Sequence, residues 1–161
     1  MTSRLALFFA LAFSVLEAAN AQTTSCRLNA GGSLVFAPYD GLSLAAGDSL
    51  TTVQVSCTRN GGPRTVDISL AIGAGSSGSV SARRMVRTAA PVDYLNYGLF
   101  RDVSRTAVWG ITPGVDTVTS SLNIENGATA VTTFTIYGRL PAQQNVYAGD
   151  YSDSVVLTLT P

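Results

Sequence analysis

Apolar and polar side chains alternate with a period of two along much of this chain. The alternation is clearest in residues 65–72, where Val66, Ile68, Leu70 and Ile72 alternate with polar or smaller residues. A period of two is typical of a strand with one buried face and one exposed face. The same pattern predicts four further strands, at residues 52–57, 118–124, 133–136 and 154–160.

Short turn sequences rich in Gly, Asn, Asp and Pro separate these predicted strands. They lie at residues 40–41, 60–63, 113–114, 126–127 and 148–150. No amphipathic helix is visible after residue 21, so the pattern predicts the all-β class and an antiparallel β-sandwich. Residues 73–90 begin with a Gly- and Ser-rich stretch, and we expect a long loop followed by a short strand there.

The N-terminal segment has the features of a secretory signal peptide. Residues 1–4 carry one positive charge, and residues 5–16 form an apolar run that only Ser14 interrupts. A membrane-spanning helix needs roughly 20 apolar residues, and this run is shorter. Ala19 and Ala21 supply the small-x-small pattern of a cleavage site. We therefore predict a signal peptide at residues 1–21, one mature domain at 22–161, and export to the periplasm and then to the cell surface.

The composition argues against several functional classes. The formal net charge is zero and only 12% of the residues are charged, whereas a nucleic-acid or anionic-membrane binder shows a concentrated basic face. All ten basic residues are Arg, and there is no His. The commonest general base and metal ligand is therefore missing, and we expect neither an enzyme nor a bound cofactor or metal.

Two motifs that resemble chemical sites have simpler interpretations. Gly73, Gly75 and Gly78 spell GxGxxG after a predicted strand, but no helix follows, so we interpret them as a loop and not a phosphate cradle. Asp150 and Asp153 are a carboxylate pair of the kind that can hydrolyse glycans. Their surroundings indicate a turn leading into the last strand.

The mature chain contains two cysteines, Cys26 and Cys57. Because exported proteins enter an oxidising space, we predict a structural disulfide between them. A redox or metal-binding pair is the alternative, but it lacks a CxxC spacing and further ligands.

The aromatic residues of the mature chain concentrate around Trp109 and in the group Tyr94, Tyr97 and Phe100. Core packing is the favoured interpretation. The alternative is an exposed aromatic surface used for adhesion.

A series of short motifs in a fixed order resembles the spore coat protein U domain of archaic, Csu-type chaperone-usher pilins. The motifs are Cys26, LVFAPYD at 34–40, VSCT at 55–58, RM at 84–85, LNYGLFRD at 95–102, VWG at 108–110, IYGRLPAQQ at 136–144 and AGDYSD at 148–153. They cover nearly the whole mature chain. Ala37 and Phe100 depart from the family pattern, which has Gly and Tyr at these positions.

The resemblance implies an immunoglobulin-like sandwich that is incomplete, because it lacks its final strand and leaves a hydrophobic groove. A periplasmic chaperone, and then the next subunit delivered to an outer-membrane usher, would fill the groove by donor-strand complementation. We expect inward residues of the last strand, Val155, Leu157 and Leu159, to line this groove. The implied function is that of a structural or adhesive fibre subunit, in a pilus or a coat.

Few residues precede the domain once the predicted signal is removed. Only residues 22–25 lie between the cleavage site and Cys26, whereas a donor strand needs about ten residues. We therefore expect a tip-proximal or terminating subunit. The alternative function is that of a secreted, monomeric β-sandwich module that binds a surface or a carbohydrate.

Overall fold

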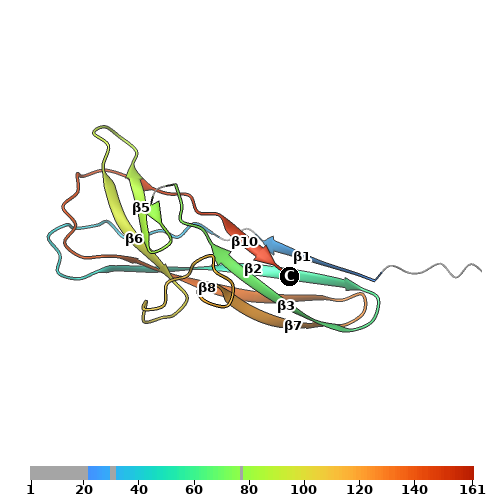
Figure 1. Cartoon of the computed structure of the whole chain (residues 1–161). Coiled ribbons are helices and arrows are strands. Elements are labelled where there is room, and N and C mark those ends of the chain that lie inside the picture. Colours follow the sequence, from blue (N-terminus) through green and yellow to red (C-terminus); the bar gives the residue numbers. More distant parts are fainter. Residues whose placement is uncertain (1–21, 30–31, 77) are drawn as a thin grey trace, which may run out of the picture.

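The computed structural model describes residues 22–29, 32–76 and 78–161. In these residues every regular element is a strand, and the strands form two antiparallel sheets that pack as a sandwich (Figure 1). The all-β prediction is confirmed. The predicted signal peptide, residues 1–21, lies outside the described residues. No helix long and apolar enough to cross a membrane occurs in the described ranges.

The larger sheet forms one face of the sandwich and extends along its whole length. Its strand order is β1 (Thr23–Asn29), β2 (Gly47–Asn60), β8 (Thr129–Leu140), β6 (Tyr94–Phe100), β5 (Ala82–Arg87) and β4 (Gly78–Ser79), and β9 (Tyr151–Ser152) pairs with β5. The long strands β2 and β8 pair from Gly47 opposite Leu140 to Thr58 opposite Thr129. They are the two longest strands in the described residues.

The smaller sheet has three strands. Its order is β10 (Leu157–Thr160), β3 (Arg64–Ile72) and β7 (Val118–Ile124), with β3 in the centre. The strand β10 pairs with β3 through Leu157 opposite Ile72 and Leu159 opposite Leu70. On its other side β10 has no strand partner among the described residues.

The five strands predicted from the alternation are all present, as β2, β3, β7, β8 and β10. The last is shorter than predicted: β10 begins at Leu157, and residues 154–156 are extended but belong to no ladder. Residues 73–90 contain the expected loop and the short strands β4 and β5. The pattern did not predict β1, β6 or β9: β9 has two residues, β1 has only two apolar residues, and in β6 the aromatic residues Tyr94 and Phe100 occupy outward positions of an otherwise alternating strand.

The core lies between the sheets and contains the inward residues of the central strands. Trp109 is 1% exposed, donates its indole N–H to the main-chain oxygen of Leu70 at 2.8 Å, and packs edge-on against Phe134. Tyr97 is also buried, whereas Tyr94 is exposed beneath the guanidinium of Arg84. Core packing therefore accounts for Trp109 and Tyr97, whereas Tyr94 and Phe100 lie outside the core.

One charged side chain, Arg83 on β5, is completely buried in this core. Its guanidinium donates to four main-chain oxygens at 2.7–2.9 Å, those of Gly73, Val80, Ile72 and Trp109. A buried charge is tolerated only when its hydrogen-bonding capacity is used, and these four bonds use most of it. Arg83 thereby joins β5 to the end of β3 and to the segment that carries Trp109.

The predicted disulfide is present. Cys26 of β1 lies directly opposite Cys57 of β2, with the two Cα atoms 4.0 Å apart and a sequence separation of 31 residues. The Cys57 side chain is fully buried and Cys26 is half-buried. The bond therefore attaches the edge strand β1 to the longest strand of the sandwich.

Replacing Arg83 with methionine (R83M) should destabilise the fold strongly. Methionine fills a similar length but leaves four buried carbonyl oxygens without a donor. We expect the free energy of unfolding to fall by about 3 to 5 kcal/mol. Urea denaturation followed by the fluorescence of Trp109 measures this loss. The control is the same change at the exposed Arg64; an equal loss in both variants would contradict the role given to Arg83.

Candidate functional site

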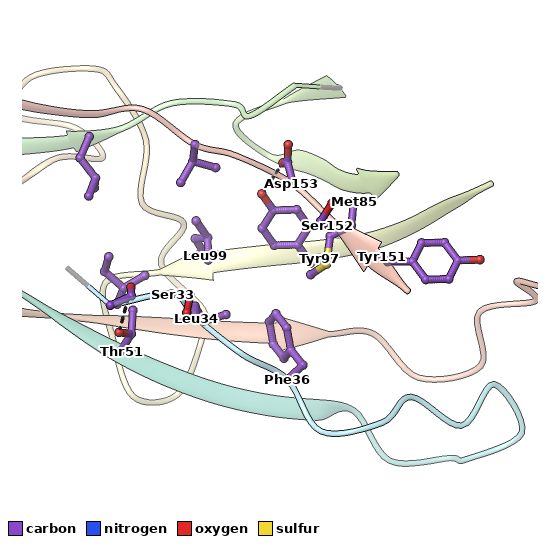
Figure 2. A pocket seen from close by; sticks show the side chains of 14 residues that line it. Ser33, Leu34, Phe36, Thr51, Met85, Tyr97, Leu99, Tyr151, Ser152 and Asp153 are labelled. Carbon is purple, nitrogen blue, oxygen red and sulfur yellow. Dashed lines mark hydrogen bonds between the residues drawn. The ribbon is translucent and has the colours of Figure 1, made fainter. Parts of the chain in front are cut away.

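The candidate site is a groove along one side of the sandwich, where the core is not closed. One wall is the segment 32–36, which follows β1, and the other is the segment 151–157, which includes β9 and leads into β10 (Figure 2). The cavity between them has a volume of about 430 Å³. Its floor consists of core side chains from β5, β6 and β8, namely Met85, Tyr97, Leu99 and Ile136.

A second cavity of about 370 Å³ continues the groove toward residues 37–39 and 149–151. It shares Leu34, Phe36, Met85 and Tyr151 with the first cavity. The shared side chains make the two cavities one trough, which follows the segment 32–39.

The main chain of both walls is largely unpaired. Residues 32–40 form no strand, although the segment runs beside β2. It is attached there through side chains, because Ser49 Oγ donates to the oxygen of Val35 at 2.5 Å and Thr51 Oγ1 donates to that of Gly32 at 3.4 Å. In the facing wall, residues 153–156 also lie outside any ladder. Main-chain groups in both walls are thus available to another strand.

The inward side chains of the walls are only half-buried. Leu34, Phe36, Val155 and Leu157 all contact the core and also line the groove. The inward residues of the central strands, such as Val53, are by contrast completely buried. The groove therefore exposes a strip of the hydrophobic core, which a further apolar layer would cover.

A glycine determines how closely the first wall approaches the sheet. Gly138 is buried on the inward face of β8, and a Cβ atom there would lie 2.7 Å from Leu34 Cδ2 and 2.8 Å from Phe36 Cζ. Real side chains do not approach so closely, so any other residue would push this wall outward. Gly138, the glycine of the sequence motif IYGR, is therefore needed for the close approach of this wall to β8.

The residues predicted for the groove divide into two groups. Val155 and Leu157 line the first cavity, as Figure 2 shows for the segment that carries them. Leu159 is half-buried against the core but does not line either of these cavities. The sequence reasoning did not find Leu34 and Phe36, because the consecutive apolar residues Leu34, Val35 and Phe36 show no period of two.

A cluster of polar groups lies in the second wall, around Asp153. The carboxylate accepts hydrogen bonds from Tyr97 Oη at 2.6 Å and from the main-chain N–H groups of Ser76 and Ser154, both at 2.8 Å. Burial alone would raise the pKa of Asp153, but the bonds from Ser76, Tyr97 and Ser154 outweigh it and hold this pKa below its usual value. Burial and the bond to Asp153 raise the pKa of Tyr97.

Two motifs of the sequence resemble chemical sites, and the structure shows where their residues lie. Gly73 and Gly75 of GxGxxG lie in the loop after β3, and Gly78 is the first residue of the short strand β4, which follows where a phosphate cradle would have a helix. Asp153 is engaged in the polar cluster, while Asp150 is exposed in the turn before β9. No group of three potential metal-binding side chains occurs in the part of the chain that the structure describes.

The end of the molecule at the left in Figure 1 is made of the loops before β2, between β5 and β6, and between β8 and β9. They are ordered by hydrogen bonds: Arg87 donates to the oxygens of Ala148 and Ala90, both at 2.6 Å, and Asp93 accepts from the N–H of Tyr147 at 2.7 Å. Apolar side chains are exposed on these loops, including Leu42, Leu44, Val92 and Tyr147. Of the aromatic group for which an adhesive surface was the alternative, Tyr94 is the residue that is exposed, at the start of β6.

The comparisons with known proteins agree with the order of the sequence motifs. The chain matches the Spore Coat Protein U domain family over residues 12–158. It is also 35% identical to Protein U of Myxococcus xanthus over 174 aligned positions, which cover 93% of this chain and 90% of the relative. With a match of this extent and identity, the chain belongs to the Spore Coat Protein U domain family.

Proposed function

We propose that this protein is a structural subunit of an extracellular fibre or coat and that subunits join by inserting a strand into the groove. The observation that carries the proposal is the groove itself, where two wall segments, 32–36 and 153–156, belong to no ladder and border a strip of exposed core. The fold is then an immunoglobulin-like sandwich without its last strand. Membership of a spore coat family supports the structural role.

The groove has the form that an extended peptide needs. The first wall follows β1 along the chain and the second leads into β10, and these two strands run in opposite directions in Figure 1. A strand between the walls is therefore parallel to one wall and antiparallel to the other. Alternate side chains of that strand point into the groove and contact Leu34, Phe36, Val155 and Leu157. Main-chain hydrogen bonds provide affinity, and the apolar positions provide the register.

An exposed strand edge above an open core invites aggregation, so the subunit needs a temporary partner before assembly. In this proposal a periplasmic chaperone supplies the first strand, and the next subunit replaces it at an outer-membrane usher. The partners are therefore proteins that donate strands, and the exported chain functions at the cell surface.

Strand insertion is tested by adding the missing strand to the chain. An Asn-Gly turn and eight alternating Val and Thr residues would replace Pro161, so that the added strand returns beside β10. Because β10 ends at Thr160, next to the groove, the two-residue turn sets the register. We expect this fusion to be a monomer by size-exclusion chromatography, with a higher thermal midpoint than the unmodified chain.

The control fusion has the same residues shifted by one position. This shift points every Val away from the groove and should abolish the gain. A stable, monomeric unmodified chain whose midpoint neither fusion raises would contradict the proposal. That outcome would favour the secreted surface- or carbohydrate-binding module instead.

Two adjacent valines test whether the added strand occupies the groove. Val155 lines the groove, whereas Val156 points outward and is 71% exposed. Val155→Asp places a charge beneath the added strand, and we expect it to remove most of the gain in thermal midpoint. Val156→Asp should leave the gain intact. Differential scanning calorimetry of each variant, with and without the added strand, gives the comparison; equal gains in both would contradict the assignment.

The position of the subunit in a fibre depends on the chain before β1. The strand β1 pairs with β2 along its whole length and is covalently attached through Cys26, so it is not available for donation. With cleavage after Ala21, the segment 22–29 lies entirely in or beside its own sheet, and the subunit accepts a strand without donating one. We expect mass spectrometry of the exported protein to give Gln22, or a neighbouring residue, as the first residue. A mature N-terminus well upstream would instead leave a donor strand and contradict the terminating position.

A further inference from the structure

The segment 153–156 forms the wall of the groove without being part of a sheet. It connects β9 to β10, and the hydrogen bond from the N–H of Gly73 to the oxygen of Val156, at 2.9 Å, attaches its main chain to the neighbouring loop. A strand that enters the groove must find this wall already in place, because ordering it during binding would cost free energy. Interactions other than strand pairing must therefore keep residues 153–156 in place.

The carboxylate of Asp153 makes that attachment, and it joins three separate parts of the chain. One oxygen accepts from the main-chain N–H and the hydroxyl of Ser76, in the loop after β3, and from the N–H of Ser154. The other oxygen accepts from the hydroxyl of Tyr97, at 2.6 Å. Tyr97 is a buried residue of β6, so the carboxylate fixes the wall to the floor of the groove, as Figure 2 shows.

A glycine in the neighbouring loop leaves room for this carboxylate. Gly75 has a φ of +87°, and a Cβ atom at this position would lie 2.1 Å from Asp153 Oδ2. Any other residue would thus be strained and would collide with the carboxylate. The glycine brings the N–H of Ser76 within 2.8 Å of Asp153 Oδ1.

The same loop is held from inside the core by Arg83. Its guanidinium donates to the oxygens of Ile72 and Gly73, while Asp153 accepts from Ser76 three residues later. The loop after β3 is therefore fixed at both ends, and it provides a rigid support for the wall. Hydrogen bonds to a charged acceptor are among the stronger ones in proteins.

We propose that Asp153 is a positioning residue for strand capture: by bonding Ser76 and Tyr97 it holds the wall in the form that presents Val155 and Leu157 to an incoming strand. The role rests on the proposed function of the groove. Both carboxylate oxygens of Asp153 are engaged in these internal bonds. It acts on the affinity of the groove by ordering one side of it before binding.

The test uses the full chain with the added alternating strand, and it measures amide hydrogen exchange strand by strand. We expect Asp153→Asn to speed exchange of the added strand's amides about tenfold, because a charged acceptor of several hydrogen bonds is lost. Exchange in β2 and β8 should not change. Ser76→Ala removes one donor from an exposed position and should produce a smaller increase in the same amides.

Asp67→Asn is the matched control, because Asp67 also accepts a hydroxyl bond, from Ser121, but lies on the outer face of β3. It should leave the added strand as protected as in the parent. Equal protection of the added strand in the parent, Asp153→Asn and Ser76→Ala would overturn the positioning role while leaving the proposed function intact. Faster exchange in all strands of Asp153→Asn would also overturn it, since the residue would then support the whole fold. An added strand unprotected even in the parent would refute the groove's function itself.

Discussion

The structure depends on the burial of one guanidinium. Arg83 brings together four carbonyl oxygens, from the end of β3, the loop after it, the turn between β4 and β5, and the segment that carries Trp109. Without a donor between them, these oxygens would be buried dipoles that repel one another. The indole of Trp109 and the phenol of Tyr97 lie in the surrounding core. A single cation thus organises the part of the sandwich next to the groove.

The groove is a consequence of how the core is distributed between the sheets. Val53 and Leu70, apolar inward residues of β2 and β3, are at most 1% exposed, whereas the segments around Leu34 and Val155 are left half-covered. The hydrophobic surface is therefore sufficient to fold the domain but is not fully used within it. Gly138 and Asp153 set the positions of the two walls, one by omitting a side chain and the other by accepting hydrogen bonds. In the proposed assembly, affinity for a strand and stability of the subunit would both come from this core.

Much of this architecture could be predicted from the sequence, because strands with one buried face have a visible period of two. The strands β2, β3, β7 and β8 follow this rule, and the disulfide follows from the predicted export of a chain with two cysteines. The first wall could not be predicted in the same way, because Leu34 and Phe36 lie in a segment that pairs with no strand. The roles of Arg83 and Asp153 were also hidden. Charged residues are normally exposed, and the partners of these two come together only in the folded chain.

The position of the disulfide has a mechanical consequence. Cys26 lies in the middle of the edge strand β1, directly opposite Cys57 of β2. A pulling force applied to the chain ahead of β1 can break only the hydrogen bonds of the first few residue pairs before it reaches a covalent bond. From there the load passes into β2, which is paired with β8 over twelve residue positions, from Gly47 to Thr58. Such a load acts along these strands and shears many hydrogen bonds at once, so the domain resists extension from the N-terminal end of β1.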